Sequence, residues 1–463
     1  MQPHPCRLTG WGRTSPTVAN LLELPTHEVP AALTEVGPRG ALARGLGRCY
    51  GDAAQNGGGL VVHPLASAHQ AVIDAERGTV TVPAGVSIDE LLEVLVPRGW
   101  FVPVTPGTRF VTIGGAIASD VHGKNHHVEG SFGNHVESLT LLLADGSQVA
   151  IGPDSDPELF WATVGGMGLT GVILEATFRL IPIETSRMSV DTERLADVDA
   201  LFTAMSEGDH NYRYSVAWID LMAKGRSLGR SVLTRGDHAR VDQLGSRHAE
   251  QPCAYGPRVQ VLVPPLVPPM GVLNRLTVGV FNELWYRKAP RHKEGELKGI
   301  ASFFHPLDMV IGWNRLYGIR GLVQYQFVIP FGQEAAMRTI IEKLSGGGTT
   351  SFLAVLKRMG PGNPAPLGFS TPGWTLALDV PAGSRGLAGL LHELDGIVLA
   401  AGGRHYLAKD AVTTPDVIRR GYPRLAEWQA VQSRVDPRGK WQSDLARRLC
   451  LTSAVIAPQE GIS

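Results

Sequence analysis

The amino-acid sequence predicts an α+β protein built from two units and a C-terminal segment. In the first unit, short segments rich in β-branched residues are separated by glycine turns, and few helices interrupt them. Beyond residue 182, strand-like segments alternate with helical ones, which is typical of helices packed on an antiparallel sheet. The end of the chain is mostly helical. We therefore expect domains over 7–182 and 183–405, and a segment over 406–463 that returns to the first domain.

Local signals define several elements of the first unit. The segment GTVTVPAG predicts a strand closed by a turn. Ser87 and Glu90 have the spacing of a capping box, and apolar residues then repeat at helical spacing, so a helix should begin here. The stretch ESLTLLLADGSQVAI (137–151) predicts a hairpin that turns at Asp145-Gly146. Further on, PELFWATVGG predicts a short helix and GVILEATFRLIPI an extended strand.

The second unit should contain both strands and helices. The segments RYSVAWID, LVQYQFVIP and GWTLALDVP are strand-like, whereas EAAMRTIIEKLSG and GLAGLLHELDGIVLAAGG have helical periodicity. The segment over 255–276 is apolar, but its prolines exclude a regular helix or a central strand. It is either a linker packed on the core or a loop that covers or contacts something apolar.

The composition excludes several functional classes. Lys and Arg (43) balance Asp and Glu (43), so we expect no binding to nucleic acid. The four cysteines are far apart and form no CxxC pair, which argues against a zinc ribbon. The N-terminus has no secretory pattern, and no apolar run reaches the roughly 18–20 residues that cross a bilayer. We therefore expect a cytoplasmic protein.

One glycine motif lies in the wrong surroundings for its usual function. In GGMGLTG, Gly166, Gly168 and Gly171 fit the GxGxxG dinucleotide fingerprint. That fingerprint needs a strand before the glycines and a helix after them, whereas here the order is reversed. We expect no Rossmann site, and we infer that these glycines allow close packing against backbone or a ligand.

Two further glycine-rich stretches predict a site for a large, flat, anionic ligand. In RGLGRCYGDAAQNGGG (44–59), glycines would let successive N–H groups converge on a diphosphate. In PVTPGTRFVTIGGAIASDVHGKNHH (103–127), small residues would let a planar group lie against the main chain.

The histidine-rich stretch SDVHGKNHHVEGSFGNH (119–135) suggests a metalloenzyme as an alternative. His122 and His126 are spaced i, i+4, as a ligand pair on a helix would be. Gly123 and Asn125 disfavour a helix there, and no carboxylate motif accompanies the histidines. We therefore expect no metal and place this stretch beneath the flat ligand. The histidines expected to have structural roles are His126, His127 and His135.

The three glycine blocks, in this order, resemble the FAD-binding domain of the vanillyl-alcohol oxidase superfamily. The chain is further similar to the decaprenylphosphoryl-β-D-ribose oxidase family, the flavoprotein half of an actinobacterial 2-epimerase. The motifs that carry this likeness, from about residue 7 to residue 450, are LTGWGRT, ARGLGRCYGD, QNGGGLV, PGTRFVTIGGAIASDVHGKNHH, GSFGNHV, LFWATVGGMGLTG, ELWYRK, FFHPLDM, YQFVIP and AKD. The resemblance implies a two-subdomain PCMH-type FAD-binding domain and an antiparallel-sheet cap domain that binds substrate.

The resemblance also implies a reaction and a set of FAD-binding residues. The reaction is oxidation of the 2′-hydroxyl of decaprenylphosphoryl-β-D-ribose to the 2′-keto intermediate, toward the arabinose donor for cell-wall arabinan. Some superfamily members attach FAD through a histidine where this chain has Tyr50, so the flavin should be non-covalent, with Cys49 a weak candidate for attachment. The expected FAD-binding residues are Arg44, Gly45, Leu46, Gly47, Arg48, Cys49, Tyr50, Gly51, Pro106, Gly107, Thr108, Gly114, Gly115, Ser119, His122, Gly123, Gly168, Ile173 and Tyr406.

On the substrate side, the resemblance implies two catalytic residues and several binding residues. Lys409 is the first candidate for the base or orienting cation, and His122 is the second, because a desolvated Lys or a neutral His can accept a hydroxyl proton. The expected substrate-binding residues are Tyr50, Lys124, Tyr317, Gln324, Gln326, Lys357 and Asn363. The mycobacterial family member has a cysteine where this chain has Ala377, so capture of that thiol by nitroaromatic inhibitors should not occur here.

Two other functions remain open on sequence alone. An alditol or aldonolactone oxidase of the same superfamily would act on a soluble polyol or lactone. The apolar segment over 255–276 favours a lipid-linked pentose instead, and it would provide peripheral contact with a membrane. A non-catalytic flavin-binding protein would not need the lysines and glutamines. No second nucleotide fold is visible, so a separate NADH-dependent 2-keto reductase would have to complete the epimerisation.

Overall fold

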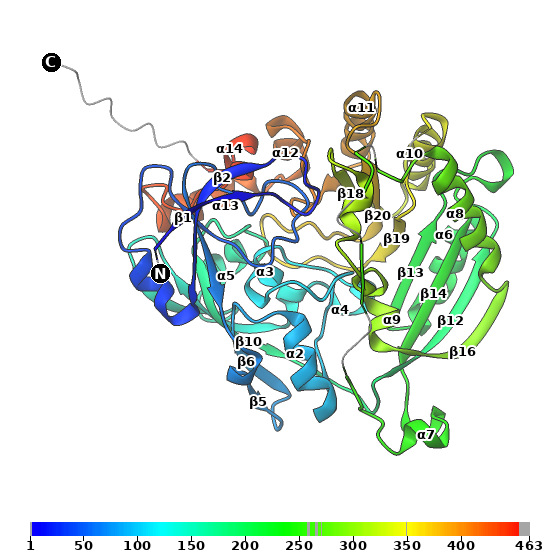
Figure 1. Cartoon of the computed structure of the whole chain (residues 1–463), viewed down its shortest axis with the longest axis horizontal. Helices are drawn as coiled ribbons and strands as arrows, with labels where there is room; N and C mark the ends of the chain where they lie inside the picture. The colour runs from blue at the N-terminus through cyan, green and yellow to red at the C-terminus, as the bar shows by residue number, and fades with distance from the viewer. Residues whose placement is uncertain (1, 257–259, 264–266, 270, 349, 453–463) are drawn as a thin grey trace.

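The computed structural model describes residues 2–256, 260–263, 267–269, 271–348 and 350–452. Two lobes lie side by side (Figure 1). The first lobe carries two small sheets and the second one large antiparallel sheet, with helices in both. The α+β class predicted from the sequence is confirmed. The boundaries between domains, at residues 182 and 405, remain a prediction.

The first lobe contains a four-stranded and a five-stranded sheet. The four-stranded sheet has the order β1-β2-β4-β3, and it comprises β1 His4–Leu8, β2 Thr17–Pro25, β3 Ala41–Ala43 and β4 Leu60–Leu65. The five-stranded sheet has the order β5-β6-β10-β8-β9, and it comprises β5 Val72–Asp74, β6 Thr79–Pro83, β8 Val136–Leu142, β9 Gln148–Ile151 and β10 Val172–Arg179. The short helix α3 (Ile113–Ala118) packs against β10 of this second sheet.

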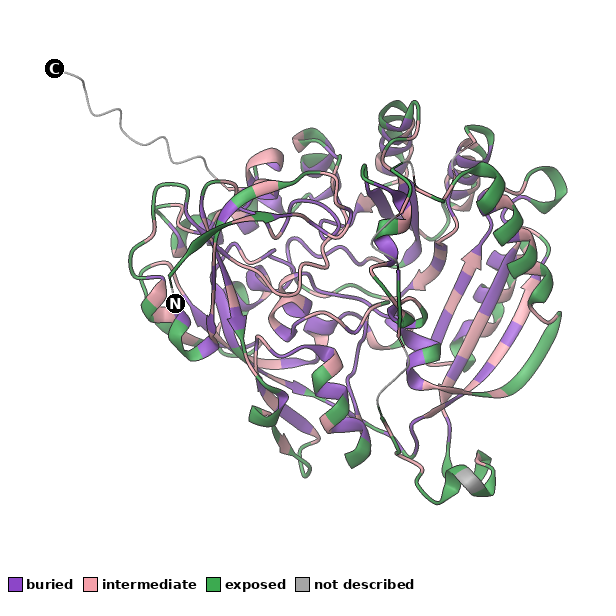
Figure 2. Ribbon diagram, in the orientation of Figure 1, coloured by how far each residue is buried: buried purple, intermediate pink, exposed green. Residues whose placement is uncertain are grey.

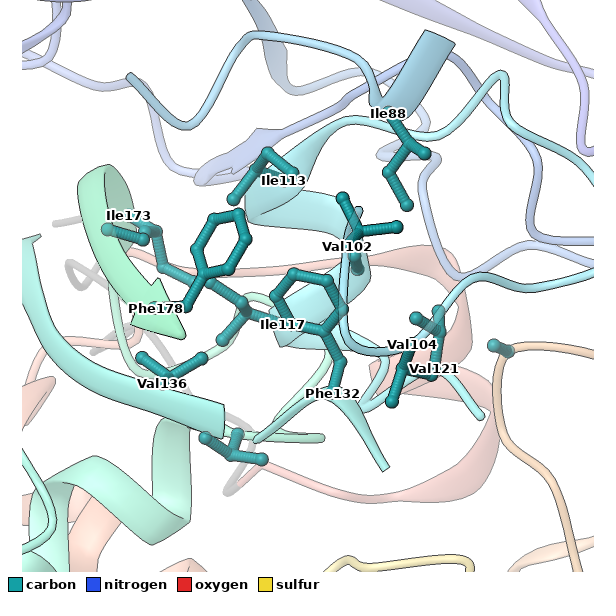
Figure 3. Close-up of a cluster of buried hydrophobic side chains, with 14 of the residues drawn as sticks. Ile88, Val102, Val104, Ile113, Ile117, Val121, Phe132, Val136, Ile173 and Phe178 are labelled. Atoms are coloured by element: carbon teal, nitrogen blue, oxygen red, sulfur yellow. The ribbon is translucent and has the colours of Figure 1, made fainter. Parts of the chain in front are cut away.

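A buried apolar cluster fixes α3 in place. Ile113 and Ile117 of α3 lie among Phe132 and Phe178, as Figure 3 shows. All four side chains are fully buried, and burying each such group contributes roughly 1.5–3 kcal/mol. This packing holds the small residues of α3 and the histidine stretch that follows it against the rest of the lobe.

The local signals of the first lobe gave correct elements. Helix α2 (Ile88–Leu95) begins at a capping box, in which the Glu90 amide donates to Ser87 Oγ at 3.2 Å and the Ser87 amide donates to Glu90 Oε2 at 3.0 Å. Strands β8 and β9 form the predicted antiparallel hairpin, and Gly146 in its turn has φ +91°. Helix α5 (Pro157–Thr163) precedes the glycines of GGMGLTG and β10 follows them, so the Rossmann order is absent there, as predicted.

The second lobe is an eight-stranded antiparallel sheet, and three of its helices pack on one face. Its order is β16-β12-β14-β13-β19-β20-β18-β21. Its strands are β12 Arg187–Leu195, β13 Tyr214–Ile219, β14 Ser231–His238, β16 His292–Gly299, β18 Leu322–Pro330, β19 Ala354–Met359, β20 Gly373–Pro381 and β21 Arg404–His405. The helices α6 Val198–Gly208, α10 Glu334–Gly346 and α11 Leu387–Ala400 share one apolar core with the sheet. On β18, Tyr325 and Phe327 belong to this core, whereas Gln324 and Gln326 point to the opposite face, toward the first lobe.

The proline-rich segment over 255–276 lies partly outside the described residues. Within the described part, the two-residue strand β15 (Val261–Leu262) pairs in parallel with β17 (Val310–Ile311). Helix α8 (Arg275–Lys288) begins only after the prolines, with Asn274 as its N-cap. Among the described residues, none of the helices combines the length and apolar character needed to span a bilayer.

The C-terminal helices pack on the first lobe. They are α12 Pro415–Gly421, α13 Leu425–Val435 and α14 Asp444–Leu449. The Trp428 indole of α13 donates to the Ala162 carbonyl of α5 at 2.9 Å, and Arg448 of α14 forms an ion pair with Asp52 at 2.7 Å.

Short elements elsewhere include α1 Val29–Ala32, α4 His126–Glu129, α7 Ser246–Ala249, α9 Ile300–Phe304, β7 Trp100–Phe101 and β11 Ile181–Pro182.

Candidate active site

A cavity of about 1150 Å³ lies between the two lobes. Its wall in the first lobe consists of the glycine-rich loops, and its wall in the second lobe is the face of the large sheet opposite α6, α10 and α11. A segment of the second lobe over 306–315 also lines it. The cavity is therefore built from residues that are far apart in the sequence.

The first glycine loop is held tightly by its own side chains. The Arg44 guanidinium donates to the carbonyls of Thr9 and Ala54 at 2.7 and 2.6 Å, so it braces the loop. A Cβ on Gly45 would lie 2.3 Å from the Thr112 hydroxyl, and Gly47 has φ +64°. Glycine avoids the close contact at the first position and the backbone strain at the second, and it lets the loop main chain approach a ligand closely.

The residues present fit a bound FAD. All the expected FAD-binding residues except Gly51 line the cavity. Gly114 and Gly115 of α3 leave its wall without side chains, and Gly168, with φ +77°, does the same on the far side. Gly51 has a different role, because a Cβ there would lie 2.0 Å from the Asp410 carbonyl of the C-terminal segment. Glycine at this position thus allows the two segments to pack.

The histidine stretch is not a single helix. Helix α4 begins at His126, so His122 and His126 are not on one helical face. His126 Nδ1 accepts from the Gly360 amide at 3.1 Å, His127 Nε2 donates to the Tyr212 carbonyl at 2.9 Å, and His135 Nε2 donates to the Glu129 carbonyl at 2.9 Å. These three imidazoles fix backbone segments. Among the described residues, no three His, Cys, Asp or Glu side chains converge as a metal site would require.

His122 is the histidine that faces the cavity. The Gln326 side-chain amide donates to His122 Nε2 at 2.9 Å, so the ring proton lies on Nδ1. Within the described structure, Nδ1 has no hydrogen-bond partner. Burial, with Lys357 next in effect, holds the pKa of His122 well below its usual value. The imidazole is therefore neutral at physiological pH and packs against Tyr406, with ring centroids 5.0 Å apart.

Three lysines with lowered pKa values line the same cavity. Burial lowers the pKa of Lys409 to about 8, although Asp379 opposes this effect, and the ammonium lies 4.2 Å from the centre of the Tyr50 ring. Burial and the nearby Lys409 lower the pKa of Lys357 to about 8. Burial lowers the pKa of Lys124 to about 7, and its amine donates to the Phe303 carbonyl.

One buried carboxyl group accompanies these amines. Asp379 Oδ1 accepts from the Gln324 amide, and burial raises the pKa of Asp379 to about 7. A single, partly protonated carboxylate cannot neutralise three lysines. This end of the cavity is therefore suited to an anionic ligand group.

Two of the expected substrate-binding residues do not line the cavity. The Asn363 amide donates to Asp120 Oδ2 at 2.8 Å and to Ser131 Oγ at 3.0 Å, which braces the backbone ahead of His122. Tyr317 packs beneath the wall against Phe352, with ring centroids 6.0 Å apart. Direct contact of Asn363 or Tyr317 with substrate stays a prediction. The expected substrate-binding residues that do line the cavity are Tyr50, Lys124, Gln324, Gln326 and Lys357.

Several lining residues were not predicted from the sequence. Trp218 and Lys298 come from strands that each pair with a strand distant in the sequence, and Val232 lies beside Trp218 on the neighbouring strand β14. The alternation in RYSVAWID places every second residue on one face, but it does not say which face meets the ligand. Asp379 was also not predicted from the sequence, although it lies only two residues after Ala377. Its carboxylate accepts a hydrogen bond from the Gln324 amide.

Comparisons with known proteins agree with this geometry. A model of a FAD-binding domain matches residues 28–152. The decaprenylphosphoryl-β-D-ribose oxidase of Mycolicibacterium smegmatis is 47% identical over 453 residues, 96% of this chain and 97% of that protein. An uncharacterised protein from the mprA 5′ region of Streptomyces coelicolor is 39% identical over 79% of this chain and 100% of its own length.

The lactone oxidases are similar only over a short part of the chain. The D-arabinono-1,4-lactone oxidase of Yarrowia lipolytica is 33% identical over 106 residues, 23% of this chain and 20% of that protein. The similarity to the mycobacterial oxidase, by contrast, includes both lobes and the sheet that lines the cavity. The chain therefore belongs to the decaprenylphosphoryl-β-D-ribose oxidase family of FAD-dependent oxidoreductases.

Proposed function

We propose that this protein oxidises the 2′-hydroxyl of decaprenylphosphoryl-β-D-ribose to the 2′-ketone, as the first half of an epimerisation. Family membership gives the reaction class, and the observation that carries the substrate is the group of lysines in a cavity that also has an apolar wall. FAD, when bound, supplies the acceptor for the hydride. A soluble polyol has no anionic group to match the lysines.

Lys409 is the better candidate to accept the hydroxyl proton. A pKa of about 8 leaves a useful fraction of its amine neutral near physiological pH, and a neutral amine is a competent base. His122 Nε2 already accepts a hydrogen bond from Gln326, so its free lone pair is in use. We assign His122 and Gln326 to orienting the sugar, and Lys357 and Lys124 to the phosphodiester.

We further propose that FAD binds without a covalent link. Tyr50 is buried and lies beneath the Lys409 ammonium. Burial raises the pKa of the neighbouring Cys49 thiol, which disfavours the thiolate that would attack a flavin. Denaturation in acid should release all the yellow colour into the supernatant. Colour retained in the precipitated protein would contradict this proposal.

The proposed partners follow from the reaction. A separate NADH-dependent reductase would reduce the 2-keto product, because the described fold has no Rossmann site at its GxGxxG motif. The segment over 255–276, where it is described, exposes Val261 and Leu262 and would make peripheral contact with a membrane that carries the substrate.

Anaerobic reduction of the bound flavin tests the function. The purified holoenzyme should be yellow, and decaprenylphosphoryl-β-D-ribose should bleach its absorption near the visible maximum. Xylitol and D-arabinono-1,4-lactone should not bleach it at the same concentration. Lys409→Met should keep its FAD but bleach much more slowly. Bleaching by the polyol or the lactone, but not by the lipid-linked sugar, would refute the proposal.

A further inference from the structure

One row of side chains crosses five strands of the large sheet and forms the floor of the cavity. The strand register pairs Gln326 with Ala377, Ala377 with Val355, Val355 with Trp218, and Trp218 with Val232. All five side chains line the cavity. The row is polar where it meets His122 and becomes apolar across β19, β13 and β14.

The apolar end of this row is shaped by aromatic rings. The Trp218 indole N–H donates to the Phe352 carbonyl at 3.0 Å, so its polar atom is satisfied and its ring is left to face apolar groups. Phe303 and Trp285 also line the cavity. The Lys124 ammonium lies 4.4 Å from the centre of the Phe303 ring, which brings the cationic end and the apolar end into contact.

Helix α8 continues this apolar surface to the outside of the molecule. Its inner side is fixed by polar contacts, because the Asn282 amide donates to Asp220 Oδ1 at 2.8 Å and Glu283 forms an ion pair with Arg230. Its outer side is apolar, and much of it is exposed (Figure 2). The large exposed apolar residues on α8 are Leu276 (76%), Val280 (52%), Phe281 (40%), Leu284 (64%) and Trp285 (47%).

Trp285 connects the two apolar regions. It lines the cavity and is also half-exposed on α8, where its ring stacks on Phe281 with centroids 5.8 Å apart. Phe281 in turn meets Phe352, whose carbonyl holds Trp218. Apolar residues therefore extend from Val355 inside the cavity, by way of Trp285, to the exposed side of α8.

We infer that this path binds the prenyl chain of a lipid-linked phosphate, with the first isoprene units over Val355, Trp218 and Val232 and later units on the outer side of α8. The inference rests on the proposed function, since it requires a lipid-linked substrate. The chain is attached to the phosphate, and Lys124, one of the two lysines that would bind the phosphate, adjoins the aromatic end at Phe303. A prenyl chain is apolar, flexible and longer than the cavity, so an exit lined by apolar groups matches its chemistry.

Chain-length dependence tests this inference in the holoenzyme. Substrates with the same phosphoribose head and either a farnesyl or a decaprenyl chain would be compared by anaerobic flavin reduction in detergent. Wild type should have a lower KM for the longer chain. Leu284→Gln and Trp285→Gln should raise KM for the decaprenyl substrate about tenfold, equivalent to roughly 1.4 kcal/mol. Leu284→Gln, which lies outside the cavity, should leave kcat, and KM for a methyl phosphoribose lacking the chain, unchanged.

The controls separate this inference from its alternatives. Val72→Gln replaces an exposed valine of the first lobe and should behave as wild type. Equal KM effects on all substrates, or no effect on any, would overturn the inference. Loss of activity only on vesicles, and not in detergent, would also overturn it, because α8 would then contact the membrane rather than the chain.

A binding measurement keeps the test independent of oxidation. Decaprenyl phosphate, which lacks the sugar, should quench the tryptophan fluorescence of the wild-type holoenzyme and compete with the substrate. Binding that survives in Trp285→Gln at wild-type affinity would overturn the chain site. If wild type binds decaprenyl phosphate but oxidises no phosphoribose, the proposed function fails while the prenyl site stands.

Discussion

Replacing Lys357 with methionine should stabilise the flavin-stripped protein and weaken substrate binding. Burial, followed by the nearby Lys409, lowers the pKa of Lys357 from 10.5 to about 8. At about 1.36 kcal/mol for each pH unit, this difference corresponds to a charge penalty of roughly 3 kcal/mol. Part of the side chain faces the cavity, where solvent reduces the penalty, so we expect Lys357→Met to gain about 2 kcal/mol at pH 7.

The stability gained by Lys357→Met should decrease as the pH rises. Below pH 8, Lys357 is protonated in both the folded and the unfolded protein, so the penalty is complete. Between pH 8 and 10.5, the folded protein releases the proton while the unfolded chain keeps it, and the stability of wild type rises with pH. The advantage of Lys357→Met should therefore shrink across this range.

Urea unfolding at pH 7 and at pH 9.5 would measure both effects. Lys288→Met is the matched control, because Lys288 lies at the exposed end of α8 and should show no gain at either pH. In the same variants, Lys357→Met should raise KM for the phosphoribose substrate, and Lys288→Met should not. Two results would refute the idea that the Lys357 charge is desolvated. One is a Lys357→Met variant that is no more stable than wild type at pH 7. The other is a stability difference between variant and wild type that stays constant up to pH 9.5.

Three further changes test other parts of the structure. Ser87→Ala removes the N-cap of α2 and should cost about 1 kcal/mol in urea unfolding, without changing FAD content; a loss of flavin would contradict a purely local role. Gln326→Leu removes the donor to His122 and should lower the rate of flavin reduction about tenfold while FAD stays bound; an unchanged rate would remove Gln326 from the site. Ala377→Cys, made together with Cys49→Ser, should place a thiol in the cavity. A maleimide should modify this thiol, as measured by mass spectrometry, and bound substrate should protect the thiol from modification. A thiol that does not react would contradict the orientation of β20.

Much of the first lobe followed from the sequence because its signals act over a few residues. The capping box at Ser87 and the Asp145-Gly146 turn each depend on hydrogen bonds or dihedral angles within four residues. The order of the strands in the large sheet could not be predicted from such local signals. Strand β12 pairs with β14 and with β16, about 100 residues further on, because tertiary packing selects these partners.

The candidate site was predictable where main chain forms it and less so where side chains from several strands meet. Glycine blocks are visible in the sequence because positions such as Gly45 and Gly47 favour glycine, through a close contact at the first and a positive φ at the second. The polar character of Asn363 gave no indication that Asp120 would occupy its amide. Trp218 looked like an ordinary strand residue, since nothing local shows that β13 would lie beside β19.

The floor of the cavity is separated from the core of the second lobe by the alternation of side chains along each strand. Because side chains alternate along a strand, Tyr325 and Phe327 stabilise the sheet against its helices while Gln326 faces the ligand. Each strand adds one residue to the row, so a change there alters one position of the ligand surface and no helix contact. Ala377 is such a position, at the junction of the polar and apolar ends. This chain has alanine there, so Lys409, which we propose as the proton acceptor, would have to act without a thiol at this position.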